Sequence, residues 1–127
     1  MTTGKPGMEI MERVKDDIIA AVQGAGDVAQ ATMDTISRTA RIAIRDTAEV
    51  GGDIGATAID LVTGSIEAAK ELGVSAEDAA AAAAHGALKA AEQLGSTALE
   101  VVRHCLTGTI SGVKIVLKEP FKGKGGK

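Results

Sequence analysis

The stretch TGSIEAAKELGVSAEDAAAAAAHGALKAA (residues 63–91) decides the fold of this chain. Its opening, TGSIEAA, has a counterpart twenty-two residues later in HGALKAA (85–91), and a further one in TGTISGV (107–113). Each copy carries a Gly at its second position. Twenty-two is twice eleven, and eleven residues make three helical turns at about 3.67 residues per turn. The stretch therefore predicts helices with a Gly at the same place in successive units.

Helix boundaries recur at the same interval. A Gly is followed two residues later by an N-cap residue in three places: Gly51 with Asp53, Gly73 with Ser75, and Gly95 with Thr97. A Gly just past one helix and a cap just before the next is typical of a short helix–helix connection. Gly26-Asp27, with Gln30 three residues on, gives the same signal earlier in the chain. We expect helices over about residues 8–23, 27–50, 53–72, 75–94 and 97–117.

An alternative is a longer continuous helix. A stripe of small and apolar residues runs from Ala58 to Cys105 in steps of three or four, without a break at Gly73 or Gly95. In that interpretation the glycines leave one face of the helix without side chains, so that a neighbouring helix can approach. The coincidence of Gly73 with a capping residue at Ser75 favours a break there.

Residues 109–118 also allow two interpretations. Val113, Ile115 and Leu117 alternate with other residues in a β-branched segment, which is a strand pattern. The repeat register favours a helix, and we follow it. Pro120 ends whatever element precedes it.

The composition indicates one helical domain. The chain has 127 residues, of which 23 are Ala and 16 are Gly, with one Phe and no Trp or Tyr. Ala is the best helix former, and side chains of small volume require helices to approach closely. We predict an all-α fold, an Ala/Gly-rich helical bundle or long helical hairpin built on a 22-residue repeat. The helical domain spans 8–118, between a disordered N-terminus (1–7) and a basic flexible tail (119–127).

Six glycines are candidate helix-contact residues, where a neighbouring backbone comes near: Gly51, Gly55, Gly64, Gly86, Gly108 and Gly112. Two of the pairs within this set are four residues apart and so share a helix face, in the small-xxx-small spacing that lets backbones approach. Such faces are also natural sites for a second copy of the chain.

Catalytic and metal-binding constellations are sparse. His104-Cys105 is the only adjacent pair with ligand or nucleophile character, and His85 is the only other histidine. A zinc site needs about four ligands, and a catalytic Cys needs a His and an orienting group. The adjacent acids Asp16-Asp17 and Glu77-Asp78 diverge by about 100° on a helix. We predict a protein that is not an enzyme and has no metal, cofactor or small-molecule substrate.

Basic residues gather in two places. Arg38, Arg41 and Arg45 form one stripe on a helix, which is ordinarily a solvated face and alternatively an anion-binding one. Residues 114–127 hold five Lys against one acid. A tail of this kind can contact an anionic membrane or granule surface; its candidate residues are Lys118, Phe121, Lys122, Lys124 and Lys127. Nucleic acid is not an expected partner, because no aromatic residues are interleaved.

The periodicity over about residues 27–113 resembles that of exchangeable apolipoproteins and of late-embryogenesis-abundant helices, and the Ala-rich composition resembles that of phasins. The resemblance lies in period and composition. It implies an amphipathic helical protein that coats a membrane or a storage granule reversibly.

Two function classes follow. The first is a non-catalytic helical scaffold that self-associates as a homo-oligomer; the alternative is a reversible membrane- or granule-surface-binding protein. We expect a cytoplasmic location, since the most apolar window, 99–117, carries charged residues and no secretory signal is visible at the start. Cys105 is the only Cys and cannot form an internal disulfide.

Overall fold

A computed structural model describes the backbone of residues 6–115 and the side chains of residues 11–115. Within this range the chain forms five α-helices followed by a two-stranded antiparallel hairpin: α1 (Pro6–Val22), α2 (Val28–Glu49), α3 (Ile54–Leu72), α4 (Ala76–Leu94), α5 (Ser96–Cys105), β1 (Gly108–Ile110) and β2 (Val113–Ile115). The predicted tail residues Lys118, Phe121, Lys122, Lys124 and Lys127 lie outside the described residues.

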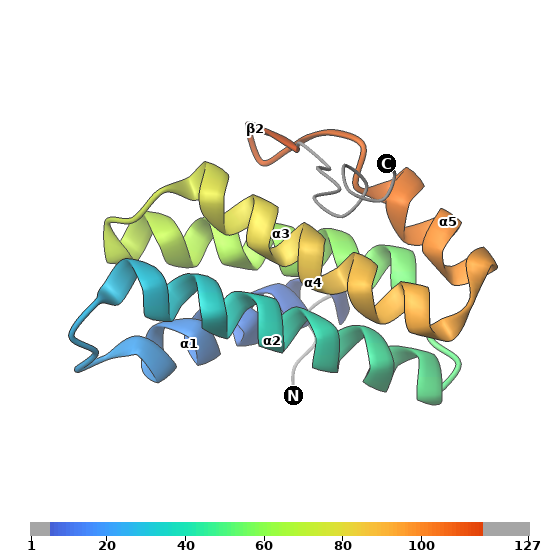
Figure 1. Ribbon diagram of the computed structural model, residues 1–127, viewed down its shortest axis with the longest axis horizontal. Coiled ribbons are helices and arrows are strands. Elements are labelled where there is room, and N and C mark those ends of the chain that lie inside the picture. The colour runs from blue at the N-terminus through green and yellow to red at the C-terminus, as the bar shows by residue number, and fades with distance from the viewer. Residues whose placement is uncertain (1–5, 116–127) are drawn as a thin grey trace, which may run out of the picture.

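The four long helices form a bundle (Figure 1). Helices α1 and α3 run toward one end of it, while α2 and α4 run toward the other. The closest pairs are α1 with α3, α3 with α4, and α4 with α2. The short helix α5 turns back over α3 and α4, and β2 lies against α4 on the same side. The chain is therefore a helical bundle and not a single long hairpin.

Three predicted N-caps are confirmed. The Oδ1 atom of Asp27 accepts a hydrogen bond from the Gln30 backbone N at 3.0 Å, and Asp53 accepts one from Ala56 at 3.1 Å. The Ser75 hydroxyl accepts a bond from the Asp78 backbone N at 3.1 Å. Each side chain satisfies a backbone donor that the first turn of a helix leaves without a partner.

The break at Gly73 is confirmed as well. Gly73 has a positive φ of 77°, and the next backbone N, that of Val74, donates to the Ala69 carbonyl at 3.0 Å. This is the left-handed ending that favours Gly, because a Cβ atom is strained in that conformation. An unbroken helix through residues 73–75 is thus wrong.

The predicted helix over about 97–117 starts within one residue of the observed helix, but its cap and its end are wrong. Helix α5 begins at Ser96 with Gly95 as a cap that has no side chain, so Thr97 is not the N-cap. It ends at Cys105, and the chain then pairs Ile110 with Val113 across a two-residue turn.

The turn explains this departure from a helix. Ser111 and Gly112 have φ of 50° and 82°, as a two-residue hairpin of matching twist requires. Ile115 is buried whereas Lys114 is exposed, so the alternation seen in the sequence is that of a strand. For the described part of this segment, residues 109–115, the strand interpretation is correct and the predicted helix is wrong.

The core is built from small side chains. The buried residues of helix α4 are all Ala or Gly, and seven of its alanines are at most 1% exposed: Ala79, Ala80, Ala83, Ala84, Ala87, Ala90 and Ala91. The larger fully buried side chains are Ile, Leu and Val from the other elements. Methyl groups on α4 let the neighbouring helices approach, as dense packing of small side chains requires.

Candidate functional site

Two of the candidate glycines lie where parallel helices touch. A Cβ atom on Gly64 of α3 would lie 2.7 Å from the Met11 carbonyl oxygen and 3.1 Å from the Val14 Cβ, both on α1. A Cβ atom on Gly86 of α4 would lie 3.0 Å from the Ala40 Cβ of α2, and would collide with the Ser37 carbonyl oxygen. The two glycines therefore occupy equivalent places, one in each parallel pair of helices.

Gly55 lies at a third close approach, between the start of α3 and the short helix α5. A Cβ atom there would be 2.7 Å from the Cys105 sulfur and 3.2 Å from the Val101 Cγ1. Cys105 is half-buried at this contact. Its position is that of a small packing side chain in the helix interface.

Gly51, Gly108 and Gly112 are not helix contacts, and their prediction as such is wrong. A Cβ atom on any of the three would have no neighbour within 4 Å in the described part of the chain. All three have positive φ, at 73°, 103° and 82°. They serve the backbone turns that end α2 and shape the hairpin, where Gly is favoured for its conformational freedom.

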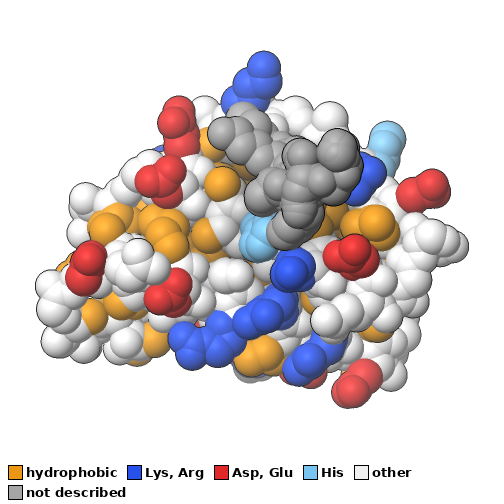
Figure 2. Space-filling view, in the orientation of Figure 1, with side chains coloured by type: hydrophobic (Ala, Val, Ile, Leu, Met, Phe, Trp, Pro, Cys, Tyr) orange, Lys and Arg blue, Asp and Glu red, His pale blue; other side chains and the backbone are white. Residues whose placement is uncertain are grey.

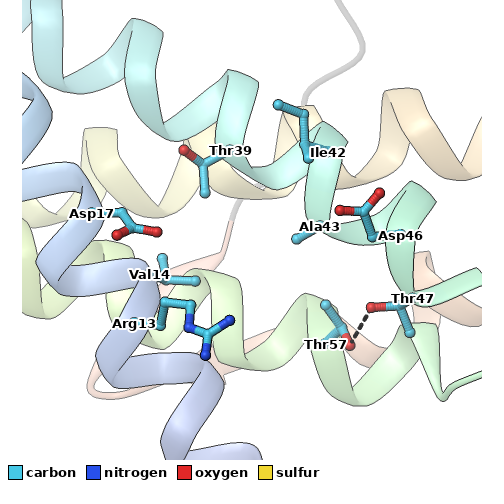
Figure 3. A pocket seen from close by; sticks show the side chains of 9 residues that line it. All are labelled: Arg13, Val14, Asp17, Thr39, Ile42, Ala43, Asp46, Thr47 and Thr57. Carbon is cyan, nitrogen blue, oxygen red and sulfur yellow. Dashed lines mark hydrogen bonds between the residues drawn. The ribbon is translucent and has the colours of Figure 1, made fainter.

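A groove of about 380 Å³ opens between α1 and α2 (Figure 3). Val14 of α1 and Ala43 of α2 supply apolar surface, and Ile42 of α2 contributes a side chain that is 45% exposed. Thr57 of α3 closes the base, where its hydroxyl lies 3.1 Å from that of Thr47 in a hydrogen bond.

Charges of both signs surround this groove. Arg13 and Asp17 come from α1, and Asp46 comes from α2 on the opposite side. No ion pair within 4.0 Å involves any of the three among the residues described. The groove thus combines an apolar centre with charged groups that are available to a partner.

The predicted arginine stripe forms a second feature. Arg38, Arg41 and Arg45 line one hollow of about 300 Å³ together with Ile42 of the same helix and with Ala90 and Gln93 of α4. Figure 2 shows Lys and Arg side chains in a band across the lower front of the molecule, where α2 and α4 lie in Figure 1. The structure therefore brings all three arginines together on one accessible face.

The other chemical candidates do not converge. His104 is exposed on α5, and no group of three or more His, Cys, Asp or Glu side chains that could hold a metal occurs in the described range. Glu77 and Asp78 lie in the first turn of α4, where acids stabilise a helix start.

Two ionisable groups have perturbed pKa values. The Lys15 ammonium of α1 donates to the Glu71 carboxylate of α3 at 3.2 Å, and this bond raises the pKa of Lys15. Partial burial on α3 raises the pKa of the Asp60 carboxyl, because the charged form loses hydration. The Lys15–Glu71 pair links the parallel helices α1 and α3 at the surface.

The arginine stripe is predictable from the sequence, whereas the groove between α1 and α2 is not. The stripe follows from spacings of three and four within one helix. The groove depends on side chains of three helices, and its signal in the sequence is weak: Ile42 stands as a large apolar residue between Arg41 and Arg45 on an otherwise polar face.

Comparison with protein-family models, with curated proteins and with solved structures finds no match to this chain. Among the helices in the described range, none has the length and apolar character needed to cross a membrane.

Proposed function

We propose that this protein is a non-catalytic helical interaction protein that pairs with a second copy of itself through the groove between α1 and α2. The observation that carries the proposal is the groove, whose apolar lining comprises buried Val14, half-buried Ala43 and Ile42, which is 45% exposed. Apolar surface of this kind gains free energy when a partner covers it, at about 25 cal/mol per Å².

The charges around the groove support a second copy as the partner. In a two-fold interface the same surface meets itself, so each residue needs a complementary residue on that same surface. Arg13 supplies the positive charge, while Asp17 and Asp46 supply the negative ones. When the groove of one copy faces that of another, each arginine can meet a carboxylate of the partner.

The groove is large enough to supply only part of a dimer interface. A stable interface buries about 800 Å² on each partner, which is more than one groove of this size offers. The exposed faces of α1 and α2 beside the groove would supply the remainder. Ile42 is then the central anchor, since the few residues that dominate the binding energy cluster near the middle of an interface.

The test is the oligomeric state of Ile42→Asp. Ile42 is 45% exposed, so a charge there is compatible with folding, which far-UV circular dichroism checks. We expect the dissociation constant of the dimer, measured by analytical ultracentrifugation, to rise at least tenfold, or about 1.4 kcal/mol.

The matched control is Ile59→Asp. Ile59 is the same residue type, is 37% exposed and lies on α3, outside the groove. Its substitution should leave the dissociation constant unchanged. A wild-type protein that stays monomeric at high concentration, or equal weakening by both substitutions, would show that the groove is not the interface.

A second candidate function has its own observation. Val50 is 82% exposed in the turn after α2, and Leu94 at the end of α4 is also exposed. Val101 of α5 is exposed as well and lies against Gly55 at the start of α3. The end of α2, the start of α3 and the end of α4 lie together at one end of the bundle (Figure 1), so exposed apolar residues are grouped there, which favours reversible contact with a membrane or another apolar surface.

A further inference from the structure

We infer that Arg38, Arg41 and Arg45 of α2 form a binding site for a phosphate group, either of a soluble phosphate ester or of a phospholipid headgroup. The three arginines line one hollow with Gln93 of α4. The three arginines lie outside the groove between α1 and α2, although Ile42 lines both, and the inference does not depend on self-association.

The geometry favours one ligand shared by several side chains. Spacings of three and four residues place the three arginines on one face of α2, a single turn apart. Gln93 adds an amide donor from the parallel helix α4, across the hollow.

Helix α2 also carries three acids, Asp34, Asp46 and Glu49, but none forms an ion pair within 4.0 Å with the three arginines in the described part of the chain. Asp34 precedes Arg38 by one turn, but its carboxylate accepts a hydrogen bond from Gln30 at 3.0 Å. Glu49 follows Arg45 by one turn, and no ion pair within 4.0 Å joins either acid to the stripe. Arg41 has only Ser37 and Arg45 at the positions four residues before and after it.

This arrangement is unfavourable for an unliganded helix. Like charges three and four residues apart repel one another on a helix surface, so each neighbouring pair in the stripe weakens α2. When an anion is bound, the electrostatic contribution of the stripe to stability becomes favourable, because each guanidinium then contacts a negative group. Removing arginines should therefore stabilise the free protein while it abolishes anion binding, a combination that a purely solvated face does not produce.

The chemistry of the lining selects the ligand class. Guanidinium groups match phosphate oxygens with paired N–H donors, which makes Arg the preferred residue for phosphate recognition. Ile42 and Ala90 give the hollow an apolar wall that can accept a substituent on the phosphate. The chain has no Trp or Tyr and a single Phe, so stacking of a nucleobase is not the basis of recognition.

The experiment uses the full chain in a phosphate-free buffer at moderate ionic strength, with inorganic pyrophosphate as the probe. Isothermal titration calorimetry compares the wild type with the double variant Arg41→Gln/Arg45→Gln. The charge-matched control is Lys70→Gln/Lys114→Gln, which removes two exposed positive charges outside the hollow. We expect saturable binding in the wild type and the control, and at least a tenfold loss of affinity in the arginine variant.

The melting temperature supplies a second readout. Without anion, the arginine variant should melt above the wild type. Pyrophosphate should raise the melting temperature of the wild type and of the lysine control, but not that of the arginine variant. Co-sedimentation with phosphatidylcholine vesicles containing phosphatidic acid then separates the two sources of phosphate. Vesicle binding that needs the arginines and that pyrophosphate displaces assigns the site to a headgroup, whereas binding of pyrophosphate alone assigns it to a soluble ester.

Two results would overturn the inference. One is the absence of saturable binding to both pyrophosphate and the vesicles. The other is equal binding by the arginine variant and the lysine control, which would mean that general positive charge, and not this hollow, attracts the anion.

Discussion

At the scale of single residues, Gly64 and Gly86 show packing overriding helix propensity. Each lies inside a helix, where Gly is less favourable than Ala by about 0.5–1 kcal/mol. Each also lies where the backbone of a parallel neighbour leaves no room for a Cβ atom. The local cost is therefore offset by close contact between α1 and α3 at Gly64, and between α2 and α4 at Gly86.

Replacement of Gly86 by Ala should destabilise the protein although it improves the intrinsic propensity of α4. The new methyl group would meet the Ser37 carbonyl oxygen and lie 3.0 Å from the Ala40 Cβ. Overpacking of this kind costs about 1–3 kcal/mol, measurable by urea denaturation. Gly26→Ala is the control, because a Cβ there meets no atom within 4 Å. A Gly86→Ala variant as stable as the wild type would mean that α2 and α4 do not approach this closely.

Asp60 should make stability depend on pH in a specific direction. Its pKa is raised above the ordinary value of 3.8 by partial burial, so the folded state binds this proton more tightly than the unfolded state. The resulting loss of unfolding free energy is absent below the pKa of the unfolded state. It grows as pH rises through the pKa of the folded state and is complete above it. Asp60→Asn should therefore raise the melting temperature at neutral pH and have little effect at about pH 3. An equal effect at both pH values would contradict burial of the charge as the cause.

At the scale of elements, helix boundaries are the part of this fold that local sequence determines best. Asp27, Asp53 and Ser75 act as predicted, because a cap contacts only a backbone N three residues away. Thr97 does not cap α5, since Gly95 adopts an extended conformation that only Gly tolerates and the helix begins directly after it.

This difference predicts unequal effects of two similar substitutions. Ser75→Ala should cost about 1 kcal/mol of unfolding free energy, because it removes the acceptor for the Asp78 backbone N. Thr97→Ala should be neutral or slightly stabilising, since Thr97 is exposed within α5 and Ala is the better helix former. Chemical denaturation of both variants measures the difference, and equal losses would mean that Thr97 also caps a helix.

The hairpin shows where repeat reasoning fails. Residues 107–113 match the earlier units at Gly108, but their neighbours are β-branched and Ser111-Gly112 is a turn signal. In α3 and α4 the corresponding positions are occupied by Glu67 and Ala68, and by Lys89 and Ala90, which are compatible with a helix. The structure of this segment is therefore determined by its turn residues and not by the spacing of its Gly.

At the scale of the whole molecule, the class of fold was predictable and the arrangement of helices was not. High Ala content and helical caps predict helices, yet nothing within one helix states that α1 and α3 run parallel. The groove between α1 and α2 follows from that arrangement and so remained invisible, whereas the arginine stripe belongs to one helix and was visible in advance. A surface whose residues all lie on one helix can be predicted from the sequence. A surface that several helices share depends on how those helices pack against one another.

The composition of the core leads to the last prediction. The core contains no aromatic side chain among the described residues, and α4 buries only Ala and Gly. Small side chains bury little apolar area. Because burial contributes about 25 cal/mol per Å², a single copy gains only modest stability from its core. Association that occurs only in the folded state adds to that stability by mass action.

The melting temperature of the wild type should therefore rise with protein concentration over about two decades, while that of Ile42→Asp should stay nearly constant. Anionic vesicles should raise it further if the end of the bundle carrying Val50, Leu94 and Val101, or the hollow lined by the three arginines, binds a surface. In the first case, replacement of Val50 by Ser, at 82% exposure, should remove the effect of vesicles without changing the dependence on concentration. A melting temperature that is high, independent of concentration and unaffected by vesicles would identify a self-sufficient monomer, because neither a second copy nor a surface would then contribute to the stability of the folded state.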